Sequence, residues 1–179
     1  MDMTETTLNS EVIYRGKILT LERQRVRLMD GRESDREIVR HNGGAAVVPV
    51  DEHGDVYLIR QFRKALDAET LEIPAGKLEQ DEAPYDCAIR ELKEETGLMS
   101  ERVESLGAFY PSPGYTDEML HIYLATDLRT GRQSPDPDEF LRVVRMPLTD
   151  VLDAIREGRI HDAKTVIGLL KAKDILKVE

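Results

Sequence analysis

Three glutamates, Glu91, Glu94 and Glu95, crowd the last turn of a short amphipathic segment within residues 76–98. As an α-helix, this segment would expose unpaired carbonyls and a partial negative charge at that end, where Lys or Arg would suit folding better. Glu91 and Glu95 would also form a like-charged pair one turn apart, which costs about a few tenths of a kcal/mol. The mismatch calls for a compensating partner, and a divalent cation is the obvious one.

Helical geometry supports a shared metal site. At about 100° per residue, the three carboxylates lie within an arc of about 100°. A predicted apolar stripe adjoins that arc, so the helix can bury one face while aiming carboxylates into a neighbouring cleft; the stripe consists of Tyr85, Ala88, Ile89 and Leu92. Oxygen ligands suit Mg²⁺ or Mn²⁺ better than zinc. Taken alone, the three glutamates leave a solvated acidic face equally open.

The residues around the glutamates form a longer ordered string. It runs Gly76, five residues, Glu82, seven residues, then Arg90-Glu91-Leu92-x-Glu94-Glu95-x-Gly97-Leu98. This string resembles the Nudix box in every position and is far more specific than a lone glycine motif. The resemblance implies the Nudix fold, an α/β/α sandwich with a mixed sheet, and hydrolysis of a nucleoside diphosphate linked to another group.

The resemblance also implies which residues hold the metal. Glu91, Glu94 and Glu95 become ligands of Mg²⁺, with Mn²⁺ as an alternative ion. In the family, a main-chain carbonyl just before the box glycine joins the metal shell, and in this chain that position is Ala75. Only the main chain of this residue would matter, so its identity as alanine carries little weight.

A second set of residues is implied to act in catalysis. In the family, a glutamate from an acidic loop near the metal acts on the attacking water, and Glu139 matches that position best. Asp138 is its rival, because the Asp-Pro repeat in this loop allows the match to shift by one residue. Glu94 is next in line as the base. Arg90 completes the catalytic group as a support for the glutamates, together with Glu82.

Markers outside the box resemble one subgroup, the ADP-ribose pyrophosphatases. They are the RQFR sequence at 60–63, the LEIPAG sequence at 71–76, and Pro113 in an SPG turn. With the box, these likenesses extend from about residue 36 to residue 166. They imply Mg²⁺-dependent hydrolysis of ADP-ribose to AMP and ribose 5-phosphate. The alternatives are a broader nucleoside diphosphate sugar hydrolase, a module that binds ADP-ribose without cleaving it, and a non-catalytic acidic interaction domain.

The subgroup resemblance implies four substrate-binding residues. Arg63 would contact the diphosphate, since an arginine at a strand end can clamp phosphate oxygens bidentately. Glu118 and Pro113 belong to a turn that would contact the substrate. Arg40, or its rival Arg36, would lie near the substrate of a partner protomer. Without the resemblance, each of these residues reads as an ordinary surface position.

The elements that must position these residues form a mixed α/β protein of 179 residues. Residues 1–41 read as a strand-rich N-terminal segment and residues 42–179 as the Nudix domain. The turn at 51–55 between two apolar runs is a hairpin signal. We expect strands within 12–29 and at 36–41, 45–50, 56–60, 71–73, 103–110, 120–125 and 140–146, and helices in the box, at 150–156 and at 162–177.

Charge and composition limit the partners. The net charge of −10 argues against a nucleic-acid backbone or an anionic membrane as the main partner. A small anionic diphosphate would therefore need bound metal and local arginines. Cys87 is the single cysteine, so no intrachain disulfide is possible. We interpret it as a small packing residue, compatible with a cytoplasmic location. The polar N-terminus predicts no signal peptide, and no apolar run approaches the ~20 residues that span a bilayer.

Assembly is the last expectation. Residues 11–41 would have exposed strand edges that need partners. In the subgroup that the chain resembles, the same segment swaps between two protomers and helps to build the partner's adenine site. We therefore expect a homodimer through the N-terminal strands. The alternative is that these strands extend the sheet of their own protomer.

Overall fold

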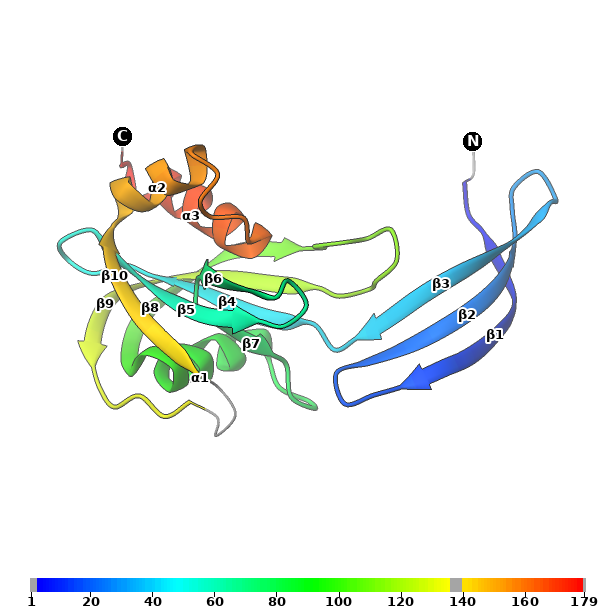
Figure 1. The fold of residues 1–179 in the computed structure, drawn as a ribbon, viewed down its shortest axis with the longest axis horizontal. Helices are drawn as coiled ribbons and strands as arrows, with labels where there is room; N and C mark the ends of the chain where they lie inside the picture. The colour runs from blue at the N-terminus through cyan, green and yellow to red at the C-terminus, as the bar shows by residue number, and fades with distance from the viewer. Residues whose placement is uncertain (1–2, 136–139, 179) are drawn as a thin grey trace. The chain divides into compact units, whose positions relative to one another are not determined.

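The computed structural model describes residues 3–135 and 140–178, which divide into two compact units. The first unit extends to Gly43 and includes Tyr110–Met119. The second comprises Gly44–Phe109 and the chain from Leu120 onward. Figure 1 shows the elements of both units in colours that follow the sequence. The metal-binding and catalytic residues expected within the box all lie in the second unit.

The first unit is a three-stranded antiparallel sheet in the order β1-β2-β3. Its neighbouring strands are joined by short glycine-containing loops, as expected for hairpins. The segment Tyr110–Met119 joins through Val39, whose N–H donates to the carbonyl of Tyr115 at 2.8 Å. The expected strand-rich N-terminal segment is therefore confirmed. Its strands are β1 (Thr6–Arg15), β2 (Leu19–Arg27) and β3 (Glu33–His41).

The second unit contains two sheets, in the orders β7-β4-β9-β8 and β10-β5-β6. The first of these is mixed, because β4 runs parallel to β9 and antiparallel to β7. Its central strand β4 is buried along its whole length, which explains its continuous apolar sequence. The strands are β4 (Gly44–Pro49), β5 (Asp55–Arg63), β6 (Ala68–Glu72), β7 (Ala75–Lys77), β8 (Leu98–Phe109), β9 (Leu120–Thr130) and β10 (Leu141–Pro147).

The prediction of a hairpin at residues 51–55 is wrong, because the two flanking strands do not pair as a hairpin. The turn is present, with the N–H of Gly54 donating to the carbonyl of Asp51 at 3.0 Å. The strands on either side nevertheless enter different sheets and share only one bridge, between Val50 and Val56. Strand β5 instead pairs along its two edges with β6 and β10, in a different sheet from β4.

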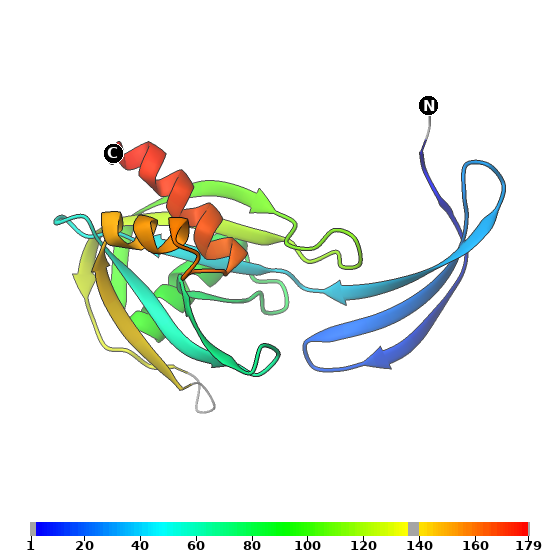
Figure 2. The same cartoon turned by 45° about the horizontal axis from the view of Figure 1, so that its top comes forward.

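Three helices cover the strands of the second unit in two layers. Ala45 and Val47 of β4 pack against α1, whereas Ala46 and Val48 share a core with α2 and α3. Figures 1 and 2 show α1 on one side of the strands and α2 and α3 on the other, which confirms the expected α/β/α sandwich. The helices are α1 (Pro84–Thr96), α2 (Leu148–Arg156) and α3 (Ala163–Leu176).

The ends of the helices follow local sequence signals. Pro84 occupies the start of α1, where its missing N–H costs no hydrogen bond. Gly97 ends α1 in the left-handed region, with φ of 72°, and its N–H donates to the carbonyl of Lys93 at 2.8 Å. Asp162 caps α3 by accepting the N–H of Thr165 at 3.0 Å. Within the part of the chain that the structure describes, no helix is long and apolar enough to cross a membrane.

Candidate active site

Two glutamates of α1 lie on its buried face. Glu91 is 7% exposed and Glu95 is 2% exposed, and they share this face with Cys87, Ala88 and Leu92. The expected apolar stripe is therefore wrong at Tyr85, which is 45% exposed. The acidic arc does not merely adjoin the packed surface of the helix. Glu91 and Glu95 are part of that surface and lie against the main chain of β7, whereas the Glu94 side chain is 36% exposed.

Strand β7 brings the two buried carboxylates side by side. The N–H of Ala75 donates to Oε2 of Glu95 at 2.9 Å. At the next residue, a Cβ added to Gly76 would lie 1.7 Å from Oε1 of Glu91. Only glycine therefore allows the Glu91 carboxylate to occupy this position. Two glutamates one helical turn apart thus meet consecutive residues of one strand, at the predicted Ala75 position.

Arg90 connects the remaining carboxylates of the box. Its Nε and Nη2 donate to Glu82 at 2.8 and 3.0 Å. Its Nη1 donates to Glu91 at 2.6 Å and to Glu94 at 3.0 Å. The hydrogen bonds from Arg90 hold the pKa of Glu82 at about 2, and they raise the pKa of Arg90 itself. Arg90 therefore contacts three carboxylates at once, and together these carry more negative charge than its single guanidinium can neutralise.

The donor set fits a hard divalent cation. Within residues 3–135 and 140–178, no three carboxylate, imidazole or thiol groups already form a complete metal cage. The available donors are nevertheless all oxygens, and Glu91 and Glu94 approach the same nitrogen of Arg90. Hard cations such as Mg²⁺ prefer oxygen ligands, often with several water molecules retained. A divalent ion would neutralise the charge that Arg90 alone leaves uncompensated.

Arg63, the predicted diphosphate contact, pairs with a buried carboxylate. Its Nε and Nη2 donate to Glu72 at 2.8 and 2.7 Å. Glu72 is 2% exposed and also accepts hydrogen bonds from Lys164 and from the hydroxyl of Thr70. Burial opposes ionisation of Glu72, but the hydrogen bonds of Arg63 and the charge of Lys164 outweigh it and hold the pKa at about 2.

Sequence reasoning did not identify Glu72 or Lys164. The signal for Glu72 was a charged residue within the otherwise apolar LEIPAG sequence. For Lys164 there was no comparable signal, because it lies 92 residues from Glu72 and resembles any lysine near the start of a helix. Their pairing arises only where the start of α3 reaches the end of β6.

Cys87 is a buried residue within the box. Its thiol lies 3.7 Å from the carbonyl of Gly76 and 3.6 Å from that of Lys77. Burial raises the pKa of Cys87 to about 12, and the negative charge of Glu82 adds to the effect. A thiol with such a pKa remains protonated and is a poor nucleophile. The geometry therefore agrees with a packing role.

The other predicted substrate residues lie in the first unit. Arg40 donates to Asp117 and to Glu22, both at 3.1 Å. The neighbouring His41 approaches Glu118, with 3.7 Å between Nδ1 and Oε1. Arg40 and Glu118 are thus held in one polar cluster of this unit.

Two further substrate candidates also belong to the first unit. Pro113 is exposed in a turn whose Ser112 carbonyl accepts the N–H of Tyr115 at 3.3 Å. Arg36, the rival of Arg40, pairs with Glu5, with 3.0 Å between Nε and Oε2. The predicted base Glu139 and its rival Asp138 lie outside the described residues.

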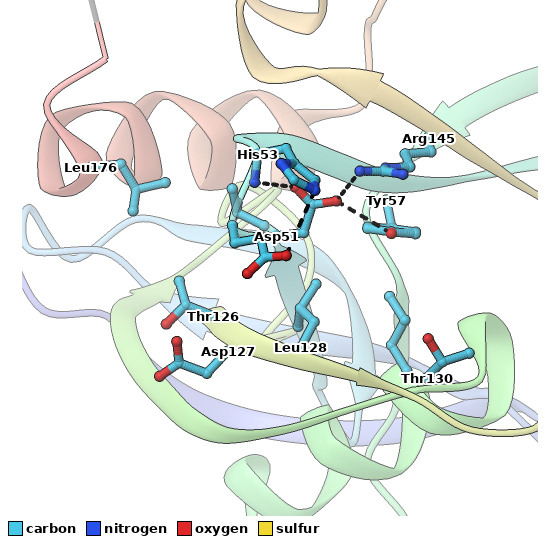
Figure 3. Close-up of a pocket in the computed structure, with 12 residues that line it drawn as sticks. Asp51, His53, Tyr57, Thr126, Asp127, Leu128, Thr130, Arg145 and Leu176 are labelled. Atoms are coloured by element: carbon cyan, nitrogen blue, oxygen red, sulfur yellow. Dashed lines mark hydrogen bonds and ion pairs between the residues drawn. The ribbon is translucent and has the colours of Figure 1, made fainter.

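A pocket of about 380 Å³ lies at the turn between β4 and β5 (Figure 3). Asp51 is at its centre and accepts hydrogen bonds from Tyr57 at 3.3 Å and from Arg145 at 2.6 Å. The N–H groups of His53 and Asp55 bind the same carboxylate. The Asp51 oxygens are fully used in holding the turn, and the pocket contains none of the predicted site residues.

Family models match nearly the whole chain. The model described as NUDIX domain matches residues 40–167. The chain belongs to the Nudix family. A second model, described as nucleoside diphosphate sugar hydrolase N-terminal domain, matches residues 5–39. The residues around α1 are therefore the box of a Nudix hydrolase, a family whose members generally use divalent metals.

Individual relatives of this Nudix protein match over almost their full length. An ADP-ribose pyrophosphatase of Bacillus subtilis (strain 168) is 39% identical, with 99% of this chain and 98% of the relative covered. The methanol dehydrogenase activator of Bacillus methanolicus is 41% identical, with 97% and 96% covered. A crystal structure described as an ADP compounds hydrolase superposes with a TM-score of 0.86 at 27% identity, covering 99% of this chain and 97% of the other. The expected Nudix fold is confirmed.

Proposed function

We propose that this Nudix hydrolase cleaves the diphosphate of ADP-ribose, with Mg²⁺, to give AMP and ribose 5-phosphate. The observation that carries the proposal is the pair of buried carboxylates, Glu91 and Glu95, held against Ala75 and Gly76. A full-length relative named as an ADP-ribose pyrophosphatase supports the choice of substrate.

The proposed metal site consists of Glu91, Glu94, Glu95 and the main-chain carbonyl of Ala75. When bound, Mg²⁺ would neutralise the diphosphate and lower the pKa of a coordinated water. Arg90 orients the carboxylates through its contacts with Glu91 and Glu94. Its third partner, Glu82, keeps its negative charge and so keeps the guanidinium in place.

The proposed base is Glu139, which would orient or deprotonate the attacking water. Arg63 would hold the negative charge that develops on the diphosphate, and no covalent intermediate is needed. Glu139→Gln should lower kcat far more than it weakens substrate binding, whereas Asp138→Asn should have a mild effect. If the two effects are reversed, Asp138 is the base. If neither change matters, the base is Glu94.

Substrate binding by the first unit and dimer formation belong to the same proposal. Every residue of β1 is exposed, which supports a need for a partner along this strand. We propose that residues 1–41 mediate a homodimer, and that residues 42–179 form the hydrolase domain. Arg40 would then approach the substrate of the partner, with Arg36 as its rival. Sedimentation tests this, since a fully active species of 20.3 kDa would contradict the dimer.

Glu118 and Pro113 complete the proposed substrate contacts. Glu118 lies in the polar cluster of the first unit with His41. Glu118→Gln should raise KM for ADP-ribose without lowering the affinity for Mg²⁺, because the residue lies outside the box. The proposed cytoplasmic location rests on the lone cysteine, and localisation of a tagged full-length chain would test it.

Broader specificity is the alternative within the same reaction class. The match of residues 5–39 to the N-terminal domain of nucleoside diphosphate sugar hydrolases favours it. A panel of nucleoside diphosphate derivatives, assayed with Mg²⁺ and with products identified, decides between the two. Strong preference for ADP-ribose supports the main proposal, and equal turnover of several sugars supports the alternative. Stoichiometric binding of ADP-ribose without AMP release would contradict both.

Activation of a dehydrogenase is a second candidate function. The relative named as a methanol dehydrogenase activator is as similar as the pyrophosphatase, which is the observation that favours it. The test adds the purified protein to a methanol dehydrogenase and measures its turnover. Stimulation by the unmodified protein but not by Glu91→Gln would link activation to the hydrolytic site.

A further inference from the structure

A buried carboxylate with two cationic partners lies behind the proposed diphosphate contact. The side chain of Glu72 is 3% exposed, and it pairs with both Arg63 and Lys164. A buried charge is costly unless it is paired and hydrogen-bonded. Arg63 already pairs with Glu72 through two hydrogen bonds, so the contact of Lys164 with the same carboxylate is not required to neutralise it.

Lys164 is held in place by the start of α3. Its ammonium group donates to Asp162 at 3.0 Å as well as to Glu72. Asp162 is the residue that caps the helix through the N–H of Thr165. The hydroxyl of Thr165 in turn accepts the N–H of Ile73, the residue after Glu72, at 2.9 Å. The first turn of α3 and the end of β6 are therefore joined at two adjacent points.

Glu72 fixes the orientation of the Arg63 side chain but does not occupy all of its hydrogen-bond donors. Its Nε and Nη2 are occupied by Glu72, while its Nη1 has no hydrogen-bond partner among the described residues. Its side chain is 42% exposed, so the Arg63 guanidinium is not enclosed by the described residues. The hydrogen bonds to Glu72 raise the pKa of Arg63, and the charges of Asp162 and Glu95 raise it further. Arg63 therefore lies within electrostatic range of a proposed metal ligand.

Sharing of the Glu72 charge explains why Lys164 lies beside a carboxylate that already pairs with Arg63. With Arg63 alone, the full negative charge of Glu72 would cancel the guanidinium charge at short range. With Lys164 present, the same carboxylate still orients the planar guanidinium but divides its charge between two cations. We propose that Lys164 is a positioning residue, which acts through Glu72 to leave Arg63 oriented and positively charged for an anionic diphosphate group. The identity of that group as part of ADP-ribose rests on the proposed function.

The first experiment compares two lysines of the same helix. Lys164→Met removes the second cation and keeps the length of the side chain, with Lys164→Gln as a replacement if the methionine variant does not fold. Lys171→Met is the matched control, since Lys171 is exposed and packs over Phe109 instead. We expect kcat/KM for ADP-ribose to fall about tenfold in the first variant and to change less than about twofold in the control. Equal values for Lys164→Met and the control would overturn the proposal.

A double-mutant cycle tests whether Lys164 acts through Glu72. In a Glu72→Gln background there is no carboxylate charge to share, so adding Lys164→Met should have little further effect on kcat/KM. If the two losses instead multiply, Lys164 acts on the substrate independently and the positioning role is wrong.

A third measurement needs no turnover. The Nε–H resonance of Arg63, observed by ¹H–¹⁵N NMR, reports on its hydrogen bond to Glu72, and inorganic pyrophosphate serves as the anionic probe. We expect pyrophosphate to shift this resonance in the unmodified protein and to require a several-fold higher concentration in Lys164→Met. An identical titration in both would overturn the inference. Failure to hydrolyse ADP-ribose with a normal pyrophosphate titration would contradict the proposed function alone.

Discussion

Two charged clusters of the second unit differ in composition. Around α1, the single cation Arg90 binds the carboxylates of Glu82, Glu91 and Glu94. Between β6 and α3, the buried carboxylate of Glu72 binds two cations, Arg63 and Lys164, and Lys164 also pairs with Asp162. In each cluster a buried carboxylate, Glu91 or Glu72, accepts a hydrogen bond from a partly exposed arginine.

The contrast shows how one acidic protein can present both signs of charge. An excess of carboxylates around one cation suits a divalent metal ion. A buried carboxylate shared by two cations instead leaves the Arg63 guanidinium less fully neutralised, which suits a phosphate group. The net charge of −10 would by itself repel an anionic substrate. Because the fields of buried groups are screened less than those at the surface, local composition outweighs the total charge.

Removing a ligand from the acidic cluster should have the largest effect. Glu91→Gln or Glu95→Gln should lower turnover about a hundredfold or more, because each removes charge and an oxygen donor from the metal site. Steady-state kinetics at several Mg²⁺ concentrations measure this. Asp86→Asn is the control, since Asp86 is an exposed carboxylate of the same helix. Near-normal activity of both glutamine variants at modest Mg²⁺ would refute the metal site.

Neutralising the carboxylate of the other cluster should cost stability in a pH-dependent way. The pKa of Glu72 is about 2 in the folded protein, below its ordinary value of 4.5. A lowered carboxyl pKa stabilises the fold above the ordinary value, and this contribution is lost as pH falls toward 2. Glu72→Gln should therefore lower the free energy of unfolding by roughly 3 kcal/mol at neutral pH. This difference from the unmodified protein should shrink between about pH 4.5 and 2.

Denaturant unfolding across this pH range measures the effect of Glu72→Gln. Glu69→Gln on the same strand is the control, because its side chain is 64% exposed and its pair with Arg60 is long, at 3.8 Å. A cost for Glu72→Gln that does not vary with pH would show that packing, not charge, stabilises this region.

Removing the cation of the acidic cluster should have a smaller effect on stability, and metal should reverse part of it. Arg90→Met leaves carboxylates facing one another and should lower the free energy of unfolding by roughly 2 kcal/mol without metal. The loss is limited because the site is partly exposed. Mg²⁺ should then stabilise the variant more than the unmodified protein, since the ion replaces the missing charge. Thermal unfolding with Mg²⁺ or a chelator tests this. Arg129→Met, which breaks an exposed pair with Glu101, is the control.

The smallest expected effect concerns Cys87, which reports on the negative field of the box. Burial, with the charge of Glu82, raises its pKa to about 12. Alkylation by iodoacetamide at about pH 8.5 should therefore be negligible in the folded protein and rapid in denaturant. Mass spectrometry measures the labelled fraction. Rapid labelling of the folded protein would mean that the thiol is neither buried nor surrounded by negative charge.

Local patterns predicted much of this arrangement. The spacing of Glu91 and Glu95 predicted one shared helix face, and Gly76 and Gly97 marked the two ends of the box. Residues 150–156 and 162–177 were predicted as helices and correspond to α2 and α3. These features depend on neighbours within a few residues, so a single sequence carries their signal.

Other predictions failed where distant strands compete for a partner. The turn at 51–55 was recognised, but the strands around it do not form a hairpin, because β5 pairs with β6 and β10 in another sheet. Tyr85 was assigned to the packed face of α1, whereas the structure buries the two glutamates there. A helical wheel gives angles but does not show which side the strands cover.

The sequence by itself determined the chemistry of the acidic cluster, since its carboxylates and their arginine lie within one helix and the turn before it. Only the tertiary structure reveals the cluster of Glu72, Arg63 and Lys164, because Glu72 and Lys164 are 92 residues apart and meet where α3 begins. Periodicity records which face of an element is buried but not what covers it. The charged partners of a buried carboxylate are settled when separate elements pack, since the cost of burying Glu72 is offset largely by cations from β5 and α3.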